Sequence, residues 1–483
     1  MTRLLPLPAL LCVVVFVLLG AGEARAKHYR NYPEPDLGGD GNAPAARSSA
    51  GNRSSSDSLP DVQHGRDMTT GREPGRGLEE DGDKKEDEEQ EPGGLFGKRL
   101  HGRGPIRVEY IYTGEILSNA RGGISTQNAT QYFGQMDLAI HADLEKLGFA
   151  PGGKLFLLGE NTHGRGLTQE FVGDFQWLSN IDAPRNFTQV SEYWWERSLL
   201  HERIAVRLGK QDCNAEFDIV DLGGDFINCS FGYDPTVPMP SYPNPSMAAA
   251  LFVKLHEKLT FKAGVWDGAP DGLTWGVSGT GTTFSIYEFK LKWDLKPGMP
   301  GDAHAGLWYH SDRFDDITPA VEMVNLAAFR TRQSKLPPAG GDIVGIAAAG
   351  DVYEGNHGFY CGAEQMIWKE KKADKKDVQG FGAFVQYGWA PPDRNPATQY
   401  LGAGVVYKGL IPRRDEDTCG LGMAKVYFSD RLPDVGSETA IELFYKVRLG
   451  KYVSLQPDLQ YIAQPSGIYR DAFVAGLRFQ TAM

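Results

Sequence analysis

The stretch Lys451 to Pro465, KYVSLQPDLQYIAQP, decides the fold class. From Val453 to Tyr461 the odd positions are apolar, whereas the even positions hold Ser, Gln, Asp and Gln. This period of two is that of a β-strand with one apolar and one polar face. Pro457 is unusual in such a strand, because proline cannot donate a hydrogen bond to a sheet and is confined to edges, strand ends and bulges. We therefore expect the strand pairing to loosen at Pro457.

The same alternation recurs along the chain from Pro105 onward. In Tyr287 to Leu295, YEFKLKWDL, aromatic and aliphatic residues alternate with charged ones. Ile441 to Leu449 shows a similar alternation, with Glu442, Lys446 and Arg448 on its polar face. Phe381 to Trp389 alternates apolar residues with Gly382, Phe384, Gln386 and Gly388. Shorter alternating segments are Val108 to Tyr112, Ile204 to Leu208, Leu259 to Val265, Ala305 to Tyr309, Leu401 to Tyr407 and Phe473 to Phe479. The pattern predicts an all-β protein.

Two all-β architectures produce such strands. A soluble sandwich buries its apolar faces against a second sheet, whereas a transmembrane antiparallel β-barrel turns them to lipid and lines a wet lumen with the polar faces. Charges of both signs on the polar faces, Tyr or Trp near the ends of the apolar faces, and an export signal favour the barrel. The length from Pro105 allows about sixteen strands. We expect Leu455, Pro457, Leu459 and Tyr461 to face outward, and Gln456, Asp458 and Gln460 to line the lumen.

The N-terminal part has a different character. An apolar run from Leu4 to Gly22 follows Arg3 and precedes Ala-Arg-Ala, which predicts a signal peptide over residues 1–26. An uncleaved N-terminal anchor is the alternative. Residues 27–104 are poor in large apolar side chains, which predicts a disordered low-complexity tail. The barrel domain is expected over 105–483, in an outer membrane of the Gram-negative type.

A short acidic tract supplies much of the net charge of −12. The tract Leu78 to Glu91, LEEDGDKKEDEEQE, carries nine acidic residues against two lysines and so supplies seven of the twelve negative charges. A basic patch for nucleic acid is lacking, so no nucleic-acid partner is expected. The mean hydropathy of −0.37 argues against a helical membrane protein.

Four cysteines remain after removal of the signal peptide: Cys213, Cys229, Cys361 and Cys419. Export permits disulfides, and the short separation of Cys213 and Cys229 favours that pair, which would leave Cys361 with Cys419. Free buried thiols are the alternative. The cysteine and histidine spacings fit no zinc site, and we expect neither a metal nor a cofactor.

Several motifs resemble a known family. EYIYTGEILSNARGG (109–123), WWERSLLHERIAVRLGKQD (194–212), PSYPNPSMAAAL (240–251), GVWDG, VQYGWAPPDRN, ETAIELFYKV and LQPDLQYIAQPSG follow one another in the order found in carbohydrate-selective porins of the OprB type. The resemblance implies a sixteen-stranded outer-membrane barrel with inward-folded loops that narrow the pore. It also implies passive diffusion of sugars, glucose-like monosaccharides above all, with mono- or small oligosaccharides and membrane lipid as partners. Both a monomer and a homotrimer are compatible with it.

Candidate sugar contacts follow from strand parity. The residues expected to face the lumen are Arg207, Lys262, Trp266, Glu288, Lys290, Trp308, His310, Glu442, Lys446, Arg448, Asp458 and Gln460. Charged and amide groups can hydrogen-bond sugar hydroxyls, and aromatic rings can stack on the C–H faces of a sugar. Each residue has a plainer interpretation as a solvated wall residue or a member of a charge ladder. For the two tryptophans that interpretation is filling of the barrel interior.

Two other functions are compatible with a barrel. A general, non-selective or structural outer-membrane barrel would need no sugar contacts. A barrel hydrolase would need a nucleophile and a base, but the sequence contains no Gly-x-Ser-x-Gly elbow or similar constellation. We therefore expect a channel and no enzyme activity.

Overall fold

The computed structural model describes residues 104–272, 275–317, 351–370, 379–432 and 435–483. The chain divides into two compact units, 1–85 and 86–483, and every described residue belongs to the second. The expected signal peptide over 1–26 lies outside the described residues, as does the expected tail up to residue 103. The rest of this section concerns the second unit alone.

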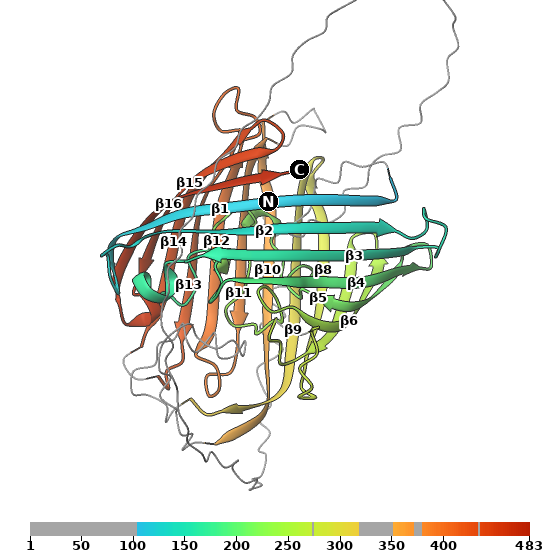
Figure 1. The fold of residues 1–483 in the computed structure, drawn as a ribbon, viewed down its shortest axis with the longest axis horizontal. Coiled ribbons are helices and arrows are strands. Elements are labelled where there is room, and N and C mark those ends of the chain that lie inside the picture. The colour runs from blue at the N-terminus through green and yellow to red at the C-terminus, as the bar shows by residue number, and fades with distance from the viewer. Residues whose placement is uncertain (1–103, 273–274, 318–350, 371–378, 433–434) are drawn as a thin grey trace, which may run out of the picture. The chain divides into compact units, whose positions relative to one another are not determined.

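The described residues form a closed antiparallel barrel of sixteen strands (Figure 1). The strands are β1 (Ile106–Gly123), β2 (Thr130–Asp143), β3 (Gly153–Gly164), β4 (Phe187–Leu199), β5 (Ile204–Gln211), β6 (Ser246–His256), β7 (Leu259–Asp267), β8 (Thr283–Lys296), β9 (Met299–Asp315), β10 (Val352–Lys369), β11 (Gly380–Trp389), β12 (Ala397–Lys408), β13 (Thr418–Phe428), β14 (Ser437–Leu449), β15 (Val453–Ala463) and β16 (Arg470–Ala482). The predicted fold class and strand number are therefore confirmed.

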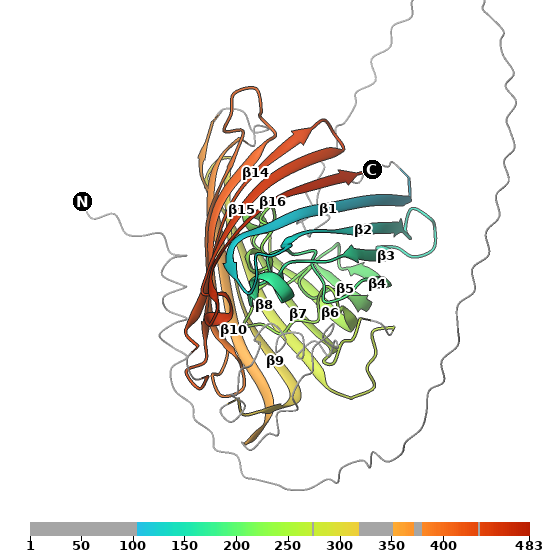
Figure 2. The ribbon, with the colours of Figure 1, turned by 60° about the vertical axis from the view of Figure 1, so that its left-hand side comes forward.

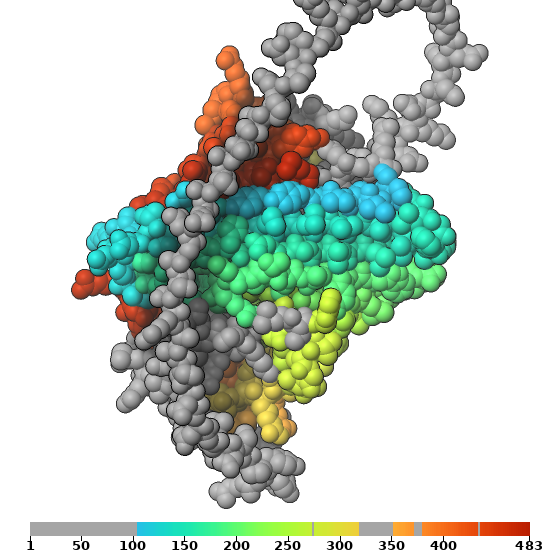
Figure 3. Space-filling model, in the orientation of Figure 1, coloured from blue at the N-terminus to red at the C-terminus, as the bar shows by residue number. Residues whose placement is uncertain are grey.

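The barrel closes between its first and last strands. Ile111 of β1 lies opposite Ala482 of β16, and the pairing continues to Gly123 opposite Arg470. Figure 2 shows these strands, blue and red, running side by side. Figure 3 shows the outer surface that β1 to β4 form together in blue to green. Closure pairs each strand on both sides, which satisfies the backbone groups that lipid cannot.

The two faces of the wall follow the predicted alternation in β15. Leu459 and Tyr461 are exposed on the outer face, whereas Gln456 and Gln460 are buried on the inner face. Pro457 stays in register with β16, opposite Leu477. On its other side the pairing with β14 stops at Asp458 and resumes at Leu455. The pairing thus loosens at the proline, as its missing N–H requires.

Two long connections fold against the inner wall. Loop A (165–186) joins β3 to β4 and contains a short helix, η1 (Thr168–Val172). Loop B (212–245) joins β5 to β6 and contains η2 (Asp221–Gly223) and η3 (Cys229–Phe231). A further short helix, η4 (Pro465–Gly467), precedes β16. Within the described ranges no helix is long and apolar enough to cross a membrane.

Aromatic packing fixes loop B against strands β11 to β14. The ring of Phe226 lies 4.3 Å from that of Phe231, 5.7 Å from that of Phe384 on β11 and 4.9 Å from that of Phe444 on β14. The two loop rings rest where β13 presents Gly422 inward. A compact apolar core therefore lies inside the barrel, between loop B and the wall.

The expected disulfides are not formed between any of the four described cysteines. Cys361 lies on β10 and Cys419 on β13, with two strands between them. Three strand spacings amount to about 14 Å, and a disulfide needs Cα atoms within about 7 Å. Cys213 is buried in a separate apolar cluster of loop B, where burial raises the pKa of its thiol. The backbone N–H of Cys229 instead donates to Trp177 of loop A.

Candidate functional site: the barrel lumen

Loops A and B are joined to each other inside the barrel. The backbone N–H of Cys229 in loop B donates to the carbonyl of Trp177 in loop A at 3.0 Å. In return, the N–H of Asn180 donates to the carbonyl of Ile227 at 2.9 Å. These two backbone hydrogen bonds join the adjoining parts of the loops within the lumen.

A glutamate of β14 holds loop A by its backbone. Glu438 Oε2 accepts a hydrogen bond from the N–H of Phe175 at 2.7 Å, and Oε1 accepts one from the N–H of Gln176 at 2.9 Å. Oε2 also accepts from the N–H of Ser466 in η4 at 2.6 Å. The Glu438 side chain is fully buried. Such charge-assisted hydrogen bonds are stronger than neutral ones, so they offset part of the cost of burying the carboxylate.

A second glutamate of β14 holds loop B in the same way. Glu442 Oε1 accepts from the N–H of Ile227 at 2.6 Å, and Oε2 accepts from the N–H of Asn228 at 2.8 Å. The side chain of Asn228 donates to Gln460 Oε1 of β15 at 3.2 Å. Gln460 in turn donates to the carbonyl of Leu178 in loop A at 2.9 Å. Strands β14 and β15 therefore bind both loops.

Strands on another part of the wall also hold loop B. Glu288 of β8 accepts from the N–H of Asp218 at 2.8 Å and from the hydroxyl of Tyr360 at 3.0 Å. Its other oxygen lies 2.8 Å from Lys262 Nζ of β7. Glu364 of β10 accepts a single loop hydrogen bond, from the N–H of Leu222 at 2.8 Å. Carboxylates of β8, β10 and β14 thus accept hydrogen bonds from the backbone of loop B.

The acidic side chains of loop B face basic side chains of the wall. Glu216 lies 2.9 Å from Arg207 of β5, and Arg207 also contacts Glu196 of β4 at 2.7 Å. Farther along the loop, Asp225 lies 2.7 Å from Lys446 of β14. The guanidinium of Arg207 is almost completely buried, whereas the Asp225 side chain is 34% exposed and that of Lys446 is 19% exposed. The Asp225–Lys446 pair is therefore open to solvent in the lumen.

Asp218 of loop B pairs with an imidazole of the wall. Its Oδ1 lies 3.0 Å from Nε2 of His304 on β9, and both side chains are almost completely buried. Burial raises the pKa of the Asp218 carboxyl above its usual value, and the hydrogen bond with His304 opposes this shift. The contact anchors the part of loop B that precedes η2.

Three carboxylates come together near η2. Oxygens of Asp221, Asp302 of β9 and Glu364 lie within 4.8 Å of one another. Carboxylate oxygens are the ligands that Ca²⁺ and Mg²⁺ prefer. However, Lys290 Nζ of β8 lies 3.0 Å from Asp302 and already supplies a positive charge to the group. The carboxylates are chemically able to bind a cation, but the ammonium group of Lys290 already balances part of their negative charge.

All twelve residues proposed from strand parity lie on the inner face of the wall. Five of them already take part in the contacts that hold loops A and B, as described above: Arg207, Lys262, Glu288, Glu442 and Gln460. Trp266 and Trp308 are nearly fully buried and belong to the apolar cluster around Phe217, so they fill the interior. Trp266 Nε1 donates to the carbonyl of Gln211 at 3.1 Å.

The remaining proposed residues have different surroundings. The imidazole of His310 lies 2.7 Å from the carbonyl oxygen of Gly268. Asp458 accepts from Gln460 at 3.1 Å. Arg448 lies near the end of β14, where its N–H donates to Asp417 at 2.9 Å. Lys290 pairs with Asp302, and Lys446 with Asp225, as described above. Among these, the pair of Lys446 is the one with substantial exposure on both members.

Sequence reasoning missed the residues of loop B that meet the wall. Glu216, Asp218, Asp221 and Asp225 lie in a segment rich in Asp, Asn and Gly, which predicts only a loop. Without the fold, nothing in that segment says that it turns inward. Glu438 could have been found, because it shares the parity of Glu442 on the same strand.

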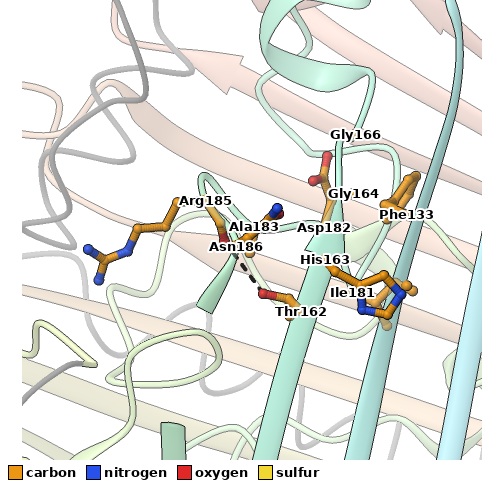
Figure 4. A pocket seen from close by; sticks show the side chains of 11 residues that line it. Phe133, Thr162, His163, Gly164, Gly166, Ile181, Asp182, Ala183, Arg185 and Asn186 are labelled. Atoms are coloured by element: carbon orange, nitrogen blue, oxygen red, sulfur yellow. Dashed lines mark hydrogen bonds between the residues drawn. The ribbon is translucent and has the colours of Figure 1, made fainter. Parts of the chain in front are cut away.

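A small pocket lies between loop A and the adjoining ends of β2 and β3. Figure 4 shows Phe133, Thr162 and His163 of the strands around it, with Asp182 pointing toward Gly166. Burial, and secondly the charge of Glu115, raise the pKa of the Asp182 carboxyl to about 8. This shift favours the protonated form of Asp182 at neutral pH, although the residue is only half-buried.

Comparison with known proteins identifies the family. Residues 127–483 match the family described as "Carbohydrate-selective porin, OprB family". The chain belongs to this family. It is 24% identical to Porin B of Pseudomonas aeruginosa over 422 residues, which covers 78% of the chain and 87% of that protein. It is 21% identical to the putative porin QuiX of Acinetobacter baylyi over 428 residues, or 76% of the chain and 88% of that protein.

Solved structures agree on the fold. The high-pH structure of Pseudomonas putida OprB superimposes with a TM-score of 0.67 at 20% identity, covering 78% of this chain and 94% of that one. The family and the barrel are those of a channel rather than an enzyme, and the family indicates an outer-membrane setting. In outer-membrane barrels the short turns lie on the periplasmic side and the longer loops outside. Loops A and B then enter the lumen from the extracellular side.

Proposed function

We propose that this OprB-family porin passes glucose-like monosaccharides passively and selectively through its lumen. The observation that carries the proposal is the partly exposed pair of Asp225 and Lys446. The pair places a hydrogen-bond acceptor and a donor 2.7 Å apart at the surface of loop B. A sugar ring presents vicinal hydroxyls that can bond to both groups in exchange for water. Such contacts are few and open to solvent, as transient binding in a channel requires.

The twelve inward residues support this proposal to different degrees. Those that hold loops A and B shape the lumen without free donors for a sugar. Lys446 keeps part of its surface open, and Arg448 shares its strand and face two residues later. We propose these two, with Asp225, as the sugar contacts on β14 and loop B. Trp266 and Trp308 act as interior packing.

Liposome swelling tests the proposal. Wild-type protein in liposomes should admit glucose faster than an uncharged solute of similar size without vicinal hydroxyls, and glucose should partly block ion conductance in planar bilayers. The double variant D225A/K446A should lose that block but remain an open channel. Equal rates for both solutes, with no block, would instead establish a general pore. Absence of any swelling would refute a porin function.

A matched control comes from an exposed ion pair elsewhere. Arg313 of β9 and Glu354 of β10 lie 3.8 Å apart, and both side chains are largely exposed. The double variant R313A/E354A removes the same two charges outside the proposed contact. Its glucose block should equal that of the wild type.

A further inference from the structure

Glu442 binds loop B with both of its oxygens, and the donors are two successive backbone N–H groups. Ile227 and Asn228 each reach a separate oxygen, at 2.6 and 2.8 Å. A carboxylate can offer two acceptors to two converging donors, whereas an amide side chain offers one acceptor and one donor. Because the donors belong to the backbone, the contact fixes the position of the loop itself.

Glu438, four residues earlier on β14, binds loop A in the same manner. Its two oxygens accept the successive N–H groups of Phe175 and Gln176 at 2.7 and 2.9 Å. Since loops A and B are hydrogen-bonded to each other, the two glutamates hold one body at two points. In loop B, Asp221 and Gly224 are exposed and Asp225 is half-buried. We expect the depth of this segment in the lumen to affect how much space is left.

We propose that Glu438 and Glu442 are positioning residues that set the size selectivity of the pore by fixing loops A and B in the lumen. This inference rests on the proposed function, since it concerns which solutes pass. The aromatic core around Phe226 also packs loop B against β11 to β14. What two directed acceptors add to such packing is a defined depth and register.

Glu364 provides a matched comparison. It is also a buried wall carboxylate that contacts loop B, but it accepts only one loop N–H, that of Leu222. A glutamine at position 364 can still accept that hydrogen bond with its carbonyl oxygen. A glutamine at position 442 leaves one of two N–H groups facing its NH₂ group. The substitutions E442Q and E364Q therefore remove the same ionisable group but differ in their effect on the hydrogen bonds.

The experiment compares wild type, E442Q and E364Q in liposomes with mono-, di- and trisaccharides. An unsatisfied buried N–H in E442Q should lower the ratio of docked to released loop B by roughly tenfold to a hundredfold. The swelling rate for di- and trisaccharides relative to glucose should then rise, and single-channel conductance should become larger and noisier. E364Q should keep the wild-type ratio. E438Q, which disrupts the loop A contact, should resemble E442Q.

Amide exchange gives a second readout on folded protein, selected by its heat-modified mobility in SDS gels. The amides of Ile227 and Asn228 should exchange faster in E442Q and at the wild-type rate in E364Q. Equal exchange and equal sugar ratios in E442Q and E364Q would overturn the inference, because only the shared loss of a carboxyl group would then matter. If wild-type protein passes no sugar, the proposed function fails. The exchange rates still show whether Glu442 holds the backbone of loop B.

Discussion

Phe231 of loop B packs directly on Gly422 of β13. A β-carbon on Gly422 would lie 2.6 Å from Cε1 of Phe231 and 2.7 Å from Cε1 of Phe226. The absence of a side chain on the wall thus creates the space that loop B occupies. Inward glycines are therefore as important to the docking of this loop as its aromatic residues.

The first prediction concerns this contact. G422V should push Phe231 off the wall and destabilise the docked loop by about 1–3 kcal/mol, the usual cost of overpacking. The barrel should still close, because the strand hydrogen bonds are unchanged. The measurement is single-channel conductance, which should increase together with the passage of disaccharides.

G159A is the control for this substitution. Gly159 lies on β3, and a β-carbon there meets no other atom within 4 Å. Its conductance should match that of the wild type. Unchanged conductance in G422V as well would show that loop B adapts to a larger wall residue.

The second prediction concerns Arg207, which is held between two carboxylates. Its guanidinium contacts Glu196 at 2.7 Å and Glu216 at 2.9 Å, and its Cζ lies 4.0 Å from the centre of the Trp194 ring. Glu196 also lies 3.7 Å from Lys154 Nζ, so R207M should cost less than about 3–5 kcal/mol, the usual penalty for leaving a buried charge unpaired. The temperature at which the folded band disappears in SDS gels should fall clearly.

R313M provides the comparison for the Arg207 substitution. Arg313 lies in an exposed pair with Glu354, and exposed pairs contribute about 0–1 kcal/mol. Its melting temperature should stay close to that of the wild type. A similar small change in R207M would mean that Lys154 is sufficient to compensate the charge of Glu196.

The third prediction is a pH dependence from Asp182. Its pKa is raised from 3.8 to about 8 in the folded protein, first by burial and then by Glu115. Between these values the folded state keeps a proton that the unfolded state has lost, so stability should fall as the pH rises from about 4 to about 8. D182N cannot ionise and should be more stable than wild type at pH 9, by more than about 1 kcal/mol, yet similar at pH 4.

Thermal unfolding followed by gel mobility at several pH values measures this effect. D415N, a substitution in the exposed turn between β12 and β13, controls for the loss of one carboxylate. It should follow the wild-type pH profile. Parallel profiles for D182N and wild type would show that Asp182 keeps its charge in the folded protein.

The strands could be predicted from the sequence because the membrane imposes a local rule. Each outward residue meets lipid, so β8, β14 and β15 show the alternation directly in their sequences. The contacts of inward residues follow no such local pattern. Glu288 and Glu442 have the parity of lumen residues, but the loops that cover them come from distant parts of the chain.

The cysteines show the same limit. Cys213 and Cys229 are near each other in sequence, yet loop B carries one into the apolar cluster around Phe217 and the other against loop A. Sequence separation says little about distance in a loop that follows the inner wall. Glycine-rich strands such as β13 were also missed, because alternating glycines carry no hydrophobic signal although they make room for Phe226 and Phe231.

The last prediction returns to Pro457. Its partner strand β14 skips the positions of Tyr445 and Lys446 in the pairing, whereas β16 pairs through Leu477. The amides of Leu443, Tyr445 and Val447 point to β15, whereas that of Lys446 points to β13, like that of Arg448. In wild type, the amide of Tyr445 should therefore exchange with solvent faster than that of Leu443. P457V supplies the missing N–H and keeps an apolar outward side chain, so it should slow this exchange and stabilise the barrel by about 1 kcal/mol. Fast exchange that persists in P457V would place the cause in the Lys446–Asp225 contact, which draws this part of β14 toward loop B.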